Sequence, residues 1–346
     1  AQIEAFDDTW HWNETAERAF DEVINSGHSD AAEMLRAMRS FLGENDMMAY
    51  LAMMAVRLIE LHRVLKPTGS LYLHCDPTAS HYLKILLDAV FGKENYRNEI
   101  IWKRTSAKSL MTKRFPTNHD IILSYGKEIG VTWNDGSIFI PYDEQNLPEK
   151  TAVKYTHFDA DGRRYRLDSL INPNADRPNL TYEFLGVTRV WRWTRDRMQR
   201  AYDEGIVVQT GPGKVPQLKR YLEEQRGLPL DDVWTDIPPI NSQAQERLGY
   251  PTQKPLALLE RILAASSNEG DVVLDPFCGC GTTVHAAEKL KRKWIGIDVT
   301  HLAVGLIKRR LIDAFPMASF DVLGVPGDVE AARELAAADQ VTSATI

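Results

Sequence analysis

The sequence has little of what marks a membrane-embedded or disulfide-stabilised protein. None of its apolar runs approaches the roughly 18 residues needed to cross a bilayer, and its first residues lack the basic-then-apolar order of a signal peptide. Its three cysteines, Cys75, Cys278 and Cys280, form no C-x-x-C pair, so neither a disulfide framework nor a structural zinc site is expected. These absences predict a cytoplasmic protein with no membrane partner and no metal.

An excess of basic residues is also absent. The chain carries 41 basic and 48 acidic residues, a net charge of -7. This balance argues against indiscriminate coating of nucleic acid, although an acidic protein can still present a local basic face. The 346 residues, 44% hydrophobic and 26% charged, are enough for about two globular domains.

The hydrophobic periodicity predicts an α/β fold. Apolar residues recur at three- and four-residue steps over 48–65, which predicts a helix, and the alternating run at 70–75 predicts a strand. The same order of helix, turn and strand recurs at 256–265 and 272–274. We further expect a helix at 283–290 and strands at 99–102, 120–125 and 294–298. This alternation is typical of a doubly wound, mostly parallel sheet.

The middle of the chain has a different composition. Residues 132–230 are rich in Arg, Asp, Pro, Gly and aromatics and contain short strand-like pieces. We therefore expect an inserted domain at 132–230 between two parts of one main domain, 1–131 and 231–322. Residues 323–346 are expected to form a helical tail.

The most specific motif is VVLDPFCGCGTT at residues 272–283, in which a strand ends in an acid and a glycine loop opens a helix. Gly279 and Gly281 permit a tight turn and close approach to a ligand, and the helix start contributes unpaired amides. A dinucleotide fingerprint needs a glycine where Val284 stands, and a P-loop needs Gly-Lys-Ser/Thr. The motif therefore predicts a small ligand other than NAD or ATP.

An acid follows at the end of the next expected strand. Asp298 lies 17 residues past Gly281, close to the offset of about 20 at which an acidic side chain reaches a ribose diol. A nucleoside-containing ligand is therefore expected. In the alternative reading, Asp275 and Asp298 are only helix caps and the glycines only form turns; the full strand-loop-helix pattern favours the ligand.

This motif resembles the FxGxG motif of the S-adenosyl-L-methionine-dependent DNA amino-methyltransferases. Residues 249–255, GYPTQKP, resemble the other cofactor-side motif of that family, placed before the glycine loop as in its β-ordered group. The resemblance covers most of the chain, including HCDP at 74–77 and WTDIPP at 234–239. It implies a permuted Rossmann-like methyltransferase fold in which the inserted domain recognises the target sequence.

The resemblance also implies roles for single residues. Asp275 would contact the methionine end of S-adenosyl-L-methionine, Phe277 would flank its adenine, and Asp298 would accept a hydrogen bond from its ribose. Thr252 and Lys254 would border the same pocket. The remaining cofactor-binding candidates belong to the glycine loop and are Gly279, Gly281 and Thr282.

The expected reaction is methylation of an exocyclic amine on a DNA base at a specific sequence, most simply N6 of adenine, as in restriction-modification systems. Such enzymes use an Asp/Asn/Ser-Pro-Pro-aromatic motif to hold a flipped base. The sequence lacks it: Asp76-Pro77 has no second proline, and Asp236-Ile237-Pro238-Pro239 has an inserted Ile and no aromatic. The resemblance places the motif upstream of Ala1, so no catalytic residue is assigned.

Three alternatives to adenine methylation stay open. They are N4-cytosine methylation, a non-catalytic fragment that binds DNA and the cofactor, and an RNA or protein methyltransferase.

Two basic clusters are candidates for contact with double-stranded DNA. The first has no acid among its neighbours and comprises Lys103, Arg104, Lys108, Lys113 and Arg114. The second lies in the expected insert and includes Arg189 and Arg192 beside Trp191 and Trp193. For the second cluster, pairing with Asp196, Asp203 and Glu204 on a solvated surface is an equally good interpretation. Whether the chain forms a homodimer stays open.

Overall fold

The computed structural model describes residues 10–106, 113, 115–241 and 243–324. The chain divides into two compact units. Phe139–Leu230 form one, here called the inserted unit, and the rest forms the core unit. The inserted unit begins later than residue 132 because Asn134 belongs to the core unit: its side-chain amide donates to the carbonyl oxygens of Ala264 and Ser267 at 2.9 and 2.8 Å.

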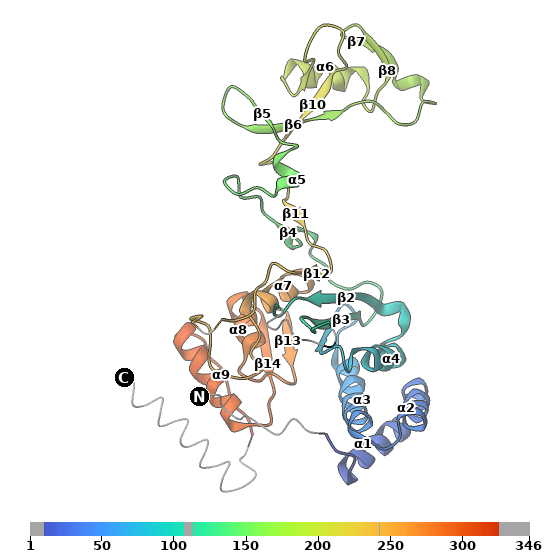
Figure 1. Ribbon diagram of the computed structural model, residues 1–346, viewed down its shortest axis with the longest axis vertical. Helices are drawn as coiled ribbons and strands as arrows, with labels where there is room; N and C mark the ends of the chain where they lie inside the picture. Colours follow the sequence, from blue (N-terminus) through green and yellow to red (C-terminus); the bar gives the residue numbers. More distant parts are fainter. Residues whose placement is uncertain (1–9, 107–112, 114, 242, 325–346) are drawn as a thin grey trace. The chain divides into compact units, whose positions relative to one another are not determined.

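The core unit alternates helices and strands, which confirms the predicted α/β class (Figure 1). Its elements are α1 (Glu14–Asn25), α2 (Ser29–Leu42), α3 (Asp46–Val64), β1 (Ser70–Cys75), α4 (Ser80–Phe91), η1 (Lys93–Asn95), β2 (Tyr96–Trp102), β3 (Asp120–Gly126), η2 (Asp135–Ser137), β12 (Val233–Trp234), α7 (Leu256–Ser266), β13 (Val272–Asp275), α8 (Thr282–Lys289), β14 (Lys293–Gly296) and α9 (His301–Ala314).

The strands of the core unit form two sheets. One has the order β1-β3-β2-β12, and the other pairs β13 with β14 in parallel. β2 and β12 are also parallel, whereas β3 runs antiparallel to both β1 and β2, which departs from the parallel order predicted from sequence. The reversal arises because β2 ends and β3 begins at the same edge of the sheet, with no crossover helix between them among the described residues.

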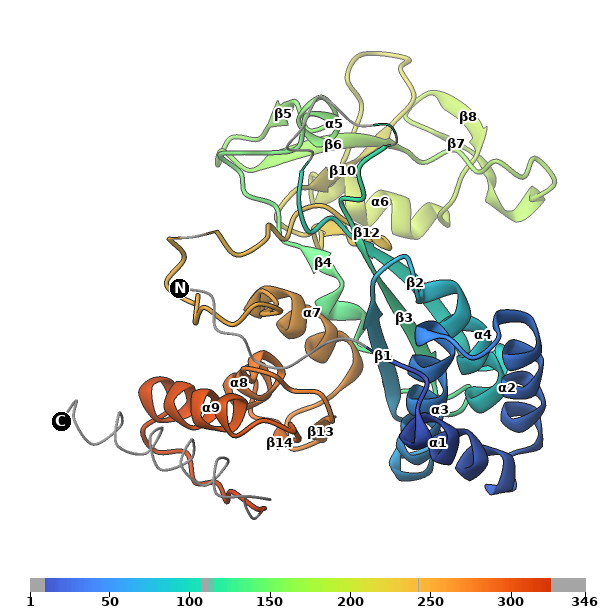
Figure 2. The same ribbon diagram turned by 60° about the horizontal axis from the view of Figure 1, so that its bottom comes forward.

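The large sheet is covered on both faces. Leu71 and Leu73 of β1, with Leu123 of β3, pack toward the core that α3 and α4 contribute, and these helices lie beside the sheet in Figure 2. Tyr72 points to the opposite face, where α7 contributes Leu258 and Ile262 to a second core. The apolar stripe of α3 that predicted a helix at 48–65 is thus buried against the sheet, and this burial is what stabilises the helix.

The inserted unit is built from short elements. Its sheet has the order β5-β6-β10-β9 with antiparallel pairs, and a hairpin of β7 and β8 packs with α6 around the fully buried Trp191. The elements are β4 (Phe139–Ile140), α5 (Glu149–Ala152), β5 (His157–Phe158), β6 (Arg164–Ser169), η3 (Pro178–Leu180), β7 (Thr181–Phe184), β8 (Val187–Val190), α6 (Arg195–Asp203), β9 (Val207–Val208), β10 (Gln217–Tyr221) and β11 (Leu228–Pro229).

The expected strand at 294–298 ends at Gly296, so Asp298 lies beyond β14 in the loop before α9. The tail expected at 323–346 lies outside the described residues from 325 onward, and residues 323–324 are not helical. Among the described helices, none combines the length and apolarity that a bilayer crossing demands.

Candidate functional site

The glycine loop between β13 and α8 has the backbone shape that the sequence predicted. Gly279 and Gly281 have φ values of +50° and +74°, in the left-handed region that favours glycine. A Cβ at Gly281 would lie 2.6 Å from Cγ1 of Ile307, and one at Gly279 would lie 3.1 Å from Cε1 of Tyr250. Both positions therefore need glycine for conformation, and Gly281 also needs it for space.

Asp298 braces this loop. One carboxylate oxygen accepts from the Gly279 amide at 2.9 Å, and the other accepts from the amide and the hydroxyl of Thr300, each at 2.9 Å. A carboxylate offers about four acceptor positions, so one remains free on this half-buried side chain. The capping role and the ligand role that the sequence offered as alternatives are therefore compatible.

Asp275 ends β13 at the base of the same loop. Its carboxylate accepts from the Phe277 amide at 3.1 Å. Burial raises the pKa of Asp275, and the negative charge of Asp298 adds to the shift, while a hydrogen bond from Thr283 opposes it. A carboxyl with a perturbed pKa at the carboxyl end of a parallel strand is a typical ligand-binding group.

The segment 249–255 packs against the loop through Tyr250. Tyr250 is buried with Cys280 and Ala303. Burial, with a contribution from Asp298, raises the pKa of Tyr250 to about 12. Thr252 is exposed, and its carbonyl accepts from Nζ of Lys254 at 3.2 Å.

Lys254 and Phe277 differ in exposure. Lys254 is half-buried, and burial lowers the pKa of its ammonium group, while Asp120 opposes the shift. Lys254 in turn influences the thiol of Cys280 electrostatically, so it lies near the loop. Phe277 is 52% exposed as a residue, so its side chain is available to a planar ligand.

Thr282 has a partner that the sequence did not indicate. Its buried hydroxyl accepts from Nη1 of Arg310 at 3.1 Å, and the same nitrogen donates to the Cys280 carbonyl at 3.4 Å. Arg310 lies in α9 and is 7% exposed. It fastens α9 to the glycine loop, and nothing in the sequence separates it from the neighbouring surface cations of α9.

A second polar cluster, also missed at the sequence level, lies where β1 and β2 end. Nε2 of His74 is 2.9 Å from Oδ2 of Asp120, and Nε of Arg104 is 2.9 Å from Oδ1 of the same carboxylate. The side chain of Asp120 is 8% exposed. In the sequence, only its place in the HCDP stretch singled out His74. Nothing in the sequence indicated a functional role for Asp120, because the residue lies at the start of a predicted strand.

The first basic cluster is partly described. Lys103 and Lys113 are exposed, whereas Lys108 and Arg114 lie outside the described residues. Arg104 is half-exposed and is engaged by Asp120. Among the residues of this cluster that the structure describes, Lys103 and Lys113 are thus the cations most open to an external anion.

In the second cluster, the arginines bind main-chain oxygens. Arg189 donates to the Thr188 carbonyl at 2.9 Å, and Arg192 donates to the Ile171 carbonyl at 3.1 Å. Within the described inserted unit, no ion pair joins either arginine to a carboxylate, so Asp196, Asp203 and Glu204 do not neutralise them.

Asp236, the acid of the nearest match to a catalytic tetrapeptide, is already engaged. Both of its carboxylate oxygens accept from the two terminal nitrogens of Arg261 on α7. The pKa of Asp236 is lowered chiefly by these hydrogen bonds. Its carboxylate therefore anchors α7 and is not free to bind a base.

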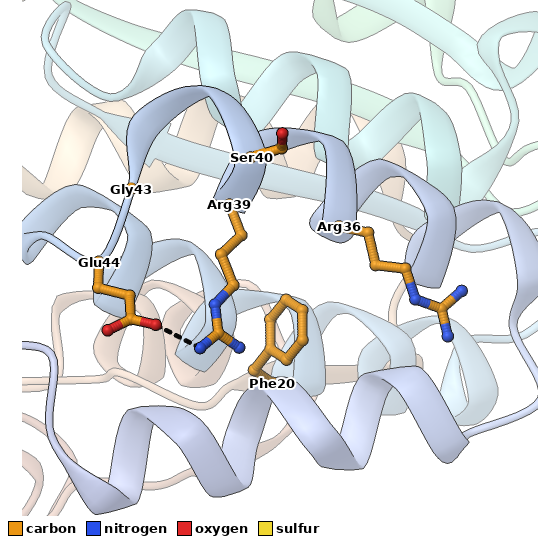
Figure 3. Close-up of a pocket in the computed structure, with 6 residues that line it drawn as sticks. All are labelled: Phe20, Arg36, Arg39, Ser40, Gly43 and Glu44. Carbon is orange, nitrogen blue, oxygen red and sulfur yellow. Dashed lines mark hydrogen bonds and ion pairs between the residues drawn. The ribbon is translucent and has the colours of Figure 1, made fainter.

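A groove of about 530 Å³ lies along α1 and α2 of the core unit (Figure 3). It is lined by Phe20, Arg36, Arg39, Ser40, Gly43 and Glu44. Arg39 spans it, donates to Glu17 and Glu44, and stacks over the rings of Trp12 and Phe20. None of the candidate ligand-binding residues lines this groove, so it carries no functional assignment.

Comparison with known proteins identifies the family. The family model for DNA methylases of the N6/N4 class matches residues 33–309, and the chain belongs to this family. It is 32% identical over 277 residues to the type II methyltransferase M.EcaI of Enterobacter cloacae, covering 79% of this chain and 60% of that protein.

Other relatives match over different lengths. The Mod subunit of the type III restriction-modification enzyme StyLTI of Salmonella typhimurium is 23% identical over 292 residues, covering 81% of this chain and 43% of the subunit. The chain therefore spans about half the length of these two relatives. The solved structure of TTHA0409 from Thermus thermophilus, in complex with S-adenosyl-L-methionine, has a TM-score of 0.44 and 19% identity and covers 82% of this chain and 84% of that one.

Proposed function

We propose that the chain binds S-adenosyl-L-methionine at the glycine loop and belongs to an enzyme that methylates the exocyclic amine of a DNA base, N6 of adenine. The observation that carries the proposal is the loop itself: two left-handed glycines, Asp275 at the end of β13, Asp298 in the loop after β14, and the packed 249–255 segment. This is the arrangement a nucleoside ligand requires. Membership of the DNA methylase family supports DNA as the substrate class.

The residues present fit this cofactor. Asp275, whose raised pKa reports desolvation, would meet the positively charged amino group of the methionine end. The exposed ring of Phe277 would flank the adenine, and the free acceptor position of Asp298 would receive a ribose hydroxyl. Lys254 and Thr252 would border the pocket. The cofactor supplies an electrophilic methyl group, and the chain holds it in place.

For DNA, we propose that Arg189 and Arg192 of the inserted unit meet phosphates or base edges, with Lys103 and Lys113 contributing from the core unit. The absence of ion pairs at both arginines in the described structure supports this assignment, because guanidinium groups that bind only main-chain oxygens keep their charge available to a polyanion. The inserted unit would then be the target-recognition domain.

Transfer itself needs acceptors for the amine and a ring to stack on the flipped base. The 346 residues contain no Asp-Pro-Pro-aromatic tetrapeptide, and Asp236 is engaged with Arg261. We therefore propose that the motif is supplied from outside these residues. In the described structure, β1 has only β3 and β13 only β14 as a hydrogen-bonded neighbour, so both can accept a further strand.

The choice of adenine is supported by one relative. The DNA adenine methyltransferase YhdJ of Escherichia coli K12 is 48% identical over 80 residues, which cover 23% of this chain and 27% of that protein. N4-cytosine methylation is the second candidate, because the matching family model covers both chemistries.

Isothermal calorimetry with S-adenosylhomocysteine tests the cofactor assignment. Asp275→Ala should weaken binding at least about tenfold, because a charge-assisted hydrogen bond contributes roughly 1.5 to 3 kcal/mol. The matched control is Asp313→Ala, which removes an exposed acid of α9. Equal affinity in the wild type and Asp275→Ala would refute the site.

The transfer assignment is tested separately. The 346-residue chain, with and without a preceding Asp-Pro-Pro-Phe strand segment, is incubated with methyl-labelled S-adenosylmethionine and mixed-sequence duplex DNA, and the nucleosides are analysed by mass spectrometry. We expect N6-methyladenine only from the extended protein. Methylation by the 346-residue chain at ordinary enzymatic rates would show that the acceptors lie within it.

A further inference from the structure

The cluster of His74, Asp120 and Arg104 occupies a defined place in the fold. The β1–β3 register sets His74 opposite Ile122, and the β2–β3 register sets Trp102 opposite Asp120. Residues paired in this way point to the same face of a sheet. The cluster therefore lies on the α7 face, at the edge where β1 and β2 end, which is the ligand-binding edge of an open α/β sheet.

The carboxylate of Asp120 joins the other two members. It accepts from His74 and Arg104 at 2.9 Å each, through different oxygens, and it is almost fully buried. Burial opposes ionisation of Asp120, but the hydrogen bond with His74 and nearby positive charges, including those of Arg104 and Lys254, lower its pKa overall, so it stays ionised at neutral pH. Burying such a group costs stability unless it is paired, which is why arrangements of this kind concentrate at functional sites.

The pair fixes the proton position on the imidazole. A carboxylate can only accept, so Nε2 of His74 carries the hydrogen and Nδ1 presents a lone pair. Burial lowers the pKa of His74, and the charges of Lys254 and Arg104 act in the same direction, whereas the hydrogen bond to Asp120 opposes them. The ring is therefore neutral near pH 7, with Nδ1 as an acceptor.

The side chain of His74 is also partly exposed, and it shares a neighbour with the glycine loop. The side chain of His74 is 25% exposed, while its partner Asp120 is not open to solvent. The ring of Trp102 meets the imidazole edge-on, with centroids 6.1 Å apart, and limits its rotation. Lys254 acts electrostatically both on Asp120 and on Cys280 of the glycine loop, so the cluster and the loop share one neighbour.

We propose that Nδ1 of His74, held by Asp120 and Arg104, accepts a hydrogen bond from the exocyclic amine of the target base. This inference rests on the proposed function, since it names a group of the core unit that recognises the amine. Asp120 and Arg104 are positioning residues, because they act only through the imidazole.

The orientation is tested first by nuclear magnetic resonance on the full chain with ¹⁵N-labelled histidine. We expect the Nε2-protonated neutral form of His74 at pH 7 and a mixture of tautomers in Asp120→Asn. A His74 that is charged at pH 7, or that carries its proton on Nδ1, overturns the proposal.

Recognition of the amine is tested with nucleotides in the presence of saturating S-adenosylhomocysteine. Deoxyadenosine monophosphate is compared with its analogue lacking the 6-amino group, and deoxycytidine monophosphate with its analogue lacking the 4-amino group. For one pair, the wild type should prefer the amine by about 2- to 10-fold, the range of a single neutral hydrogen bond. His74→Phe should abolish this preference, and the control His81→Phe, at an exposed position of α4, should keep it.

The outcomes separate the two proposals. Loss of S-adenosylhomocysteine binding in the wild type would refute the cofactor site and leave the tautomer measurement standing. Normal S-adenosylhomocysteine binding with no preference for either amine, or with a preference that survives His74→Phe, would refute the role of His74. The pair that shows the preference also identifies the base.

Discussion

Gly281→Ala should disrupt the glycine loop through two separable effects. The residue has a φ of +74°, where an L side chain costs about 1–2 kcal/mol. The new methyl group would also lie 2.6 Å from Cγ1 of Ile307, a packed side chain of α9. Such overpacking costs typically about 1–3 kcal/mol. We therefore expect a total loss of about 2–5 kcal/mol in the free energy of unfolding.

Gly270→Ala isolates the first effect. Gly270 has a φ of +82° in the turn before β13, and a Cβ there would meet no atom within 4 Å. This variant should therefore lose only the conformational share, about 1–2 kcal/mol. Urea unfolding followed by circular dichroism gives both free energies, and calorimetry with S-adenosylhomocysteine gives the affinities. Gly281→Ala should bind at least about tenfold more weakly, and Gly270→Ala should bind as the wild type does.

Equal destabilisation by the two substitutions would refute the reasoning, because it would mean that Ile307 yields at no cost. Full ligand affinity in Gly281→Ala would contradict the placement of the ligand at this loop. A double variant that combines Gly281→Ala with Ile307→Ala should recover part of the lost affinity, since it removes the atoms that the new methyl group meets.

Three further predictions follow from the charges. Asp275→Asn should raise the free energy of unfolding at pH 7 while weakening ligand binding: the folded-state pKa of Asp275 is raised, so ionisation opposes folding as pH rises above its unfolded value of about 4. Arg189→Ala and Arg192→Ala should each reduce the slope of log affinity for DNA against log salt by about 0.9. Asp236→Ala should cost about 1–3 kcal/mol, because it leaves the guanidinium of Arg261 unpaired, without changing ligand affinity.

Each of these three predictions has a control that separates the proposed cause from other causes. For Asp275→Asn, the gain in stability should vanish below about pH 4, where both states bind the proton in the wild type; a gain that persists there would have another cause. For the arginines, Arg63→Ala in α3 should leave the salt slope unchanged, since Arg63 is paired with Glu60. For Asp236, loss of ligand binding would place it in the cofactor site.

Some elements of the core unit were predictable because they carry clear periodic patterns, whereas α1, α2, α4 and α9 were not among the elements expected from the sequence. The stripe over 48–65 and the run at 70–75 correspond to α3 and β1. The reversed direction of β3 was not predictable, because a buried strand reads alike in both directions and only the path of the connecting residues decides its pairing. Single-sequence periodicity contains no such information.

The candidate site divides in the same way. The glycine loop could be recognised because its residues are adjacent in sequence and Gly279 and Gly281 are required by the backbone. The partnership of His74 with Asp120 joins residues 46 positions apart, and that of Arg310 with Thr282 joins residues 28 apart. Neither pair leaves a local pattern, since both depend on which strands and helices become neighbours.

Asp298 shows why the sequence rule for an acid after the second strand works. The rule places a carboxylate at a ribose, yet three of its acceptor positions serve the protein: the Gly279 amide and the amide and hydroxyl of Thr300. These bonds fix the carboxylate before any ligand arrives, so the remaining acceptor position is oriented in advance and little entropy is lost on binding. The bond to Gly279 simultaneously holds the left-handed loop. The position of the Asp298 carboxylate therefore depends on a correctly formed loop. A ligand that binds Asp298 consequently recognises the shape of the whole motif as well as the carboxylate.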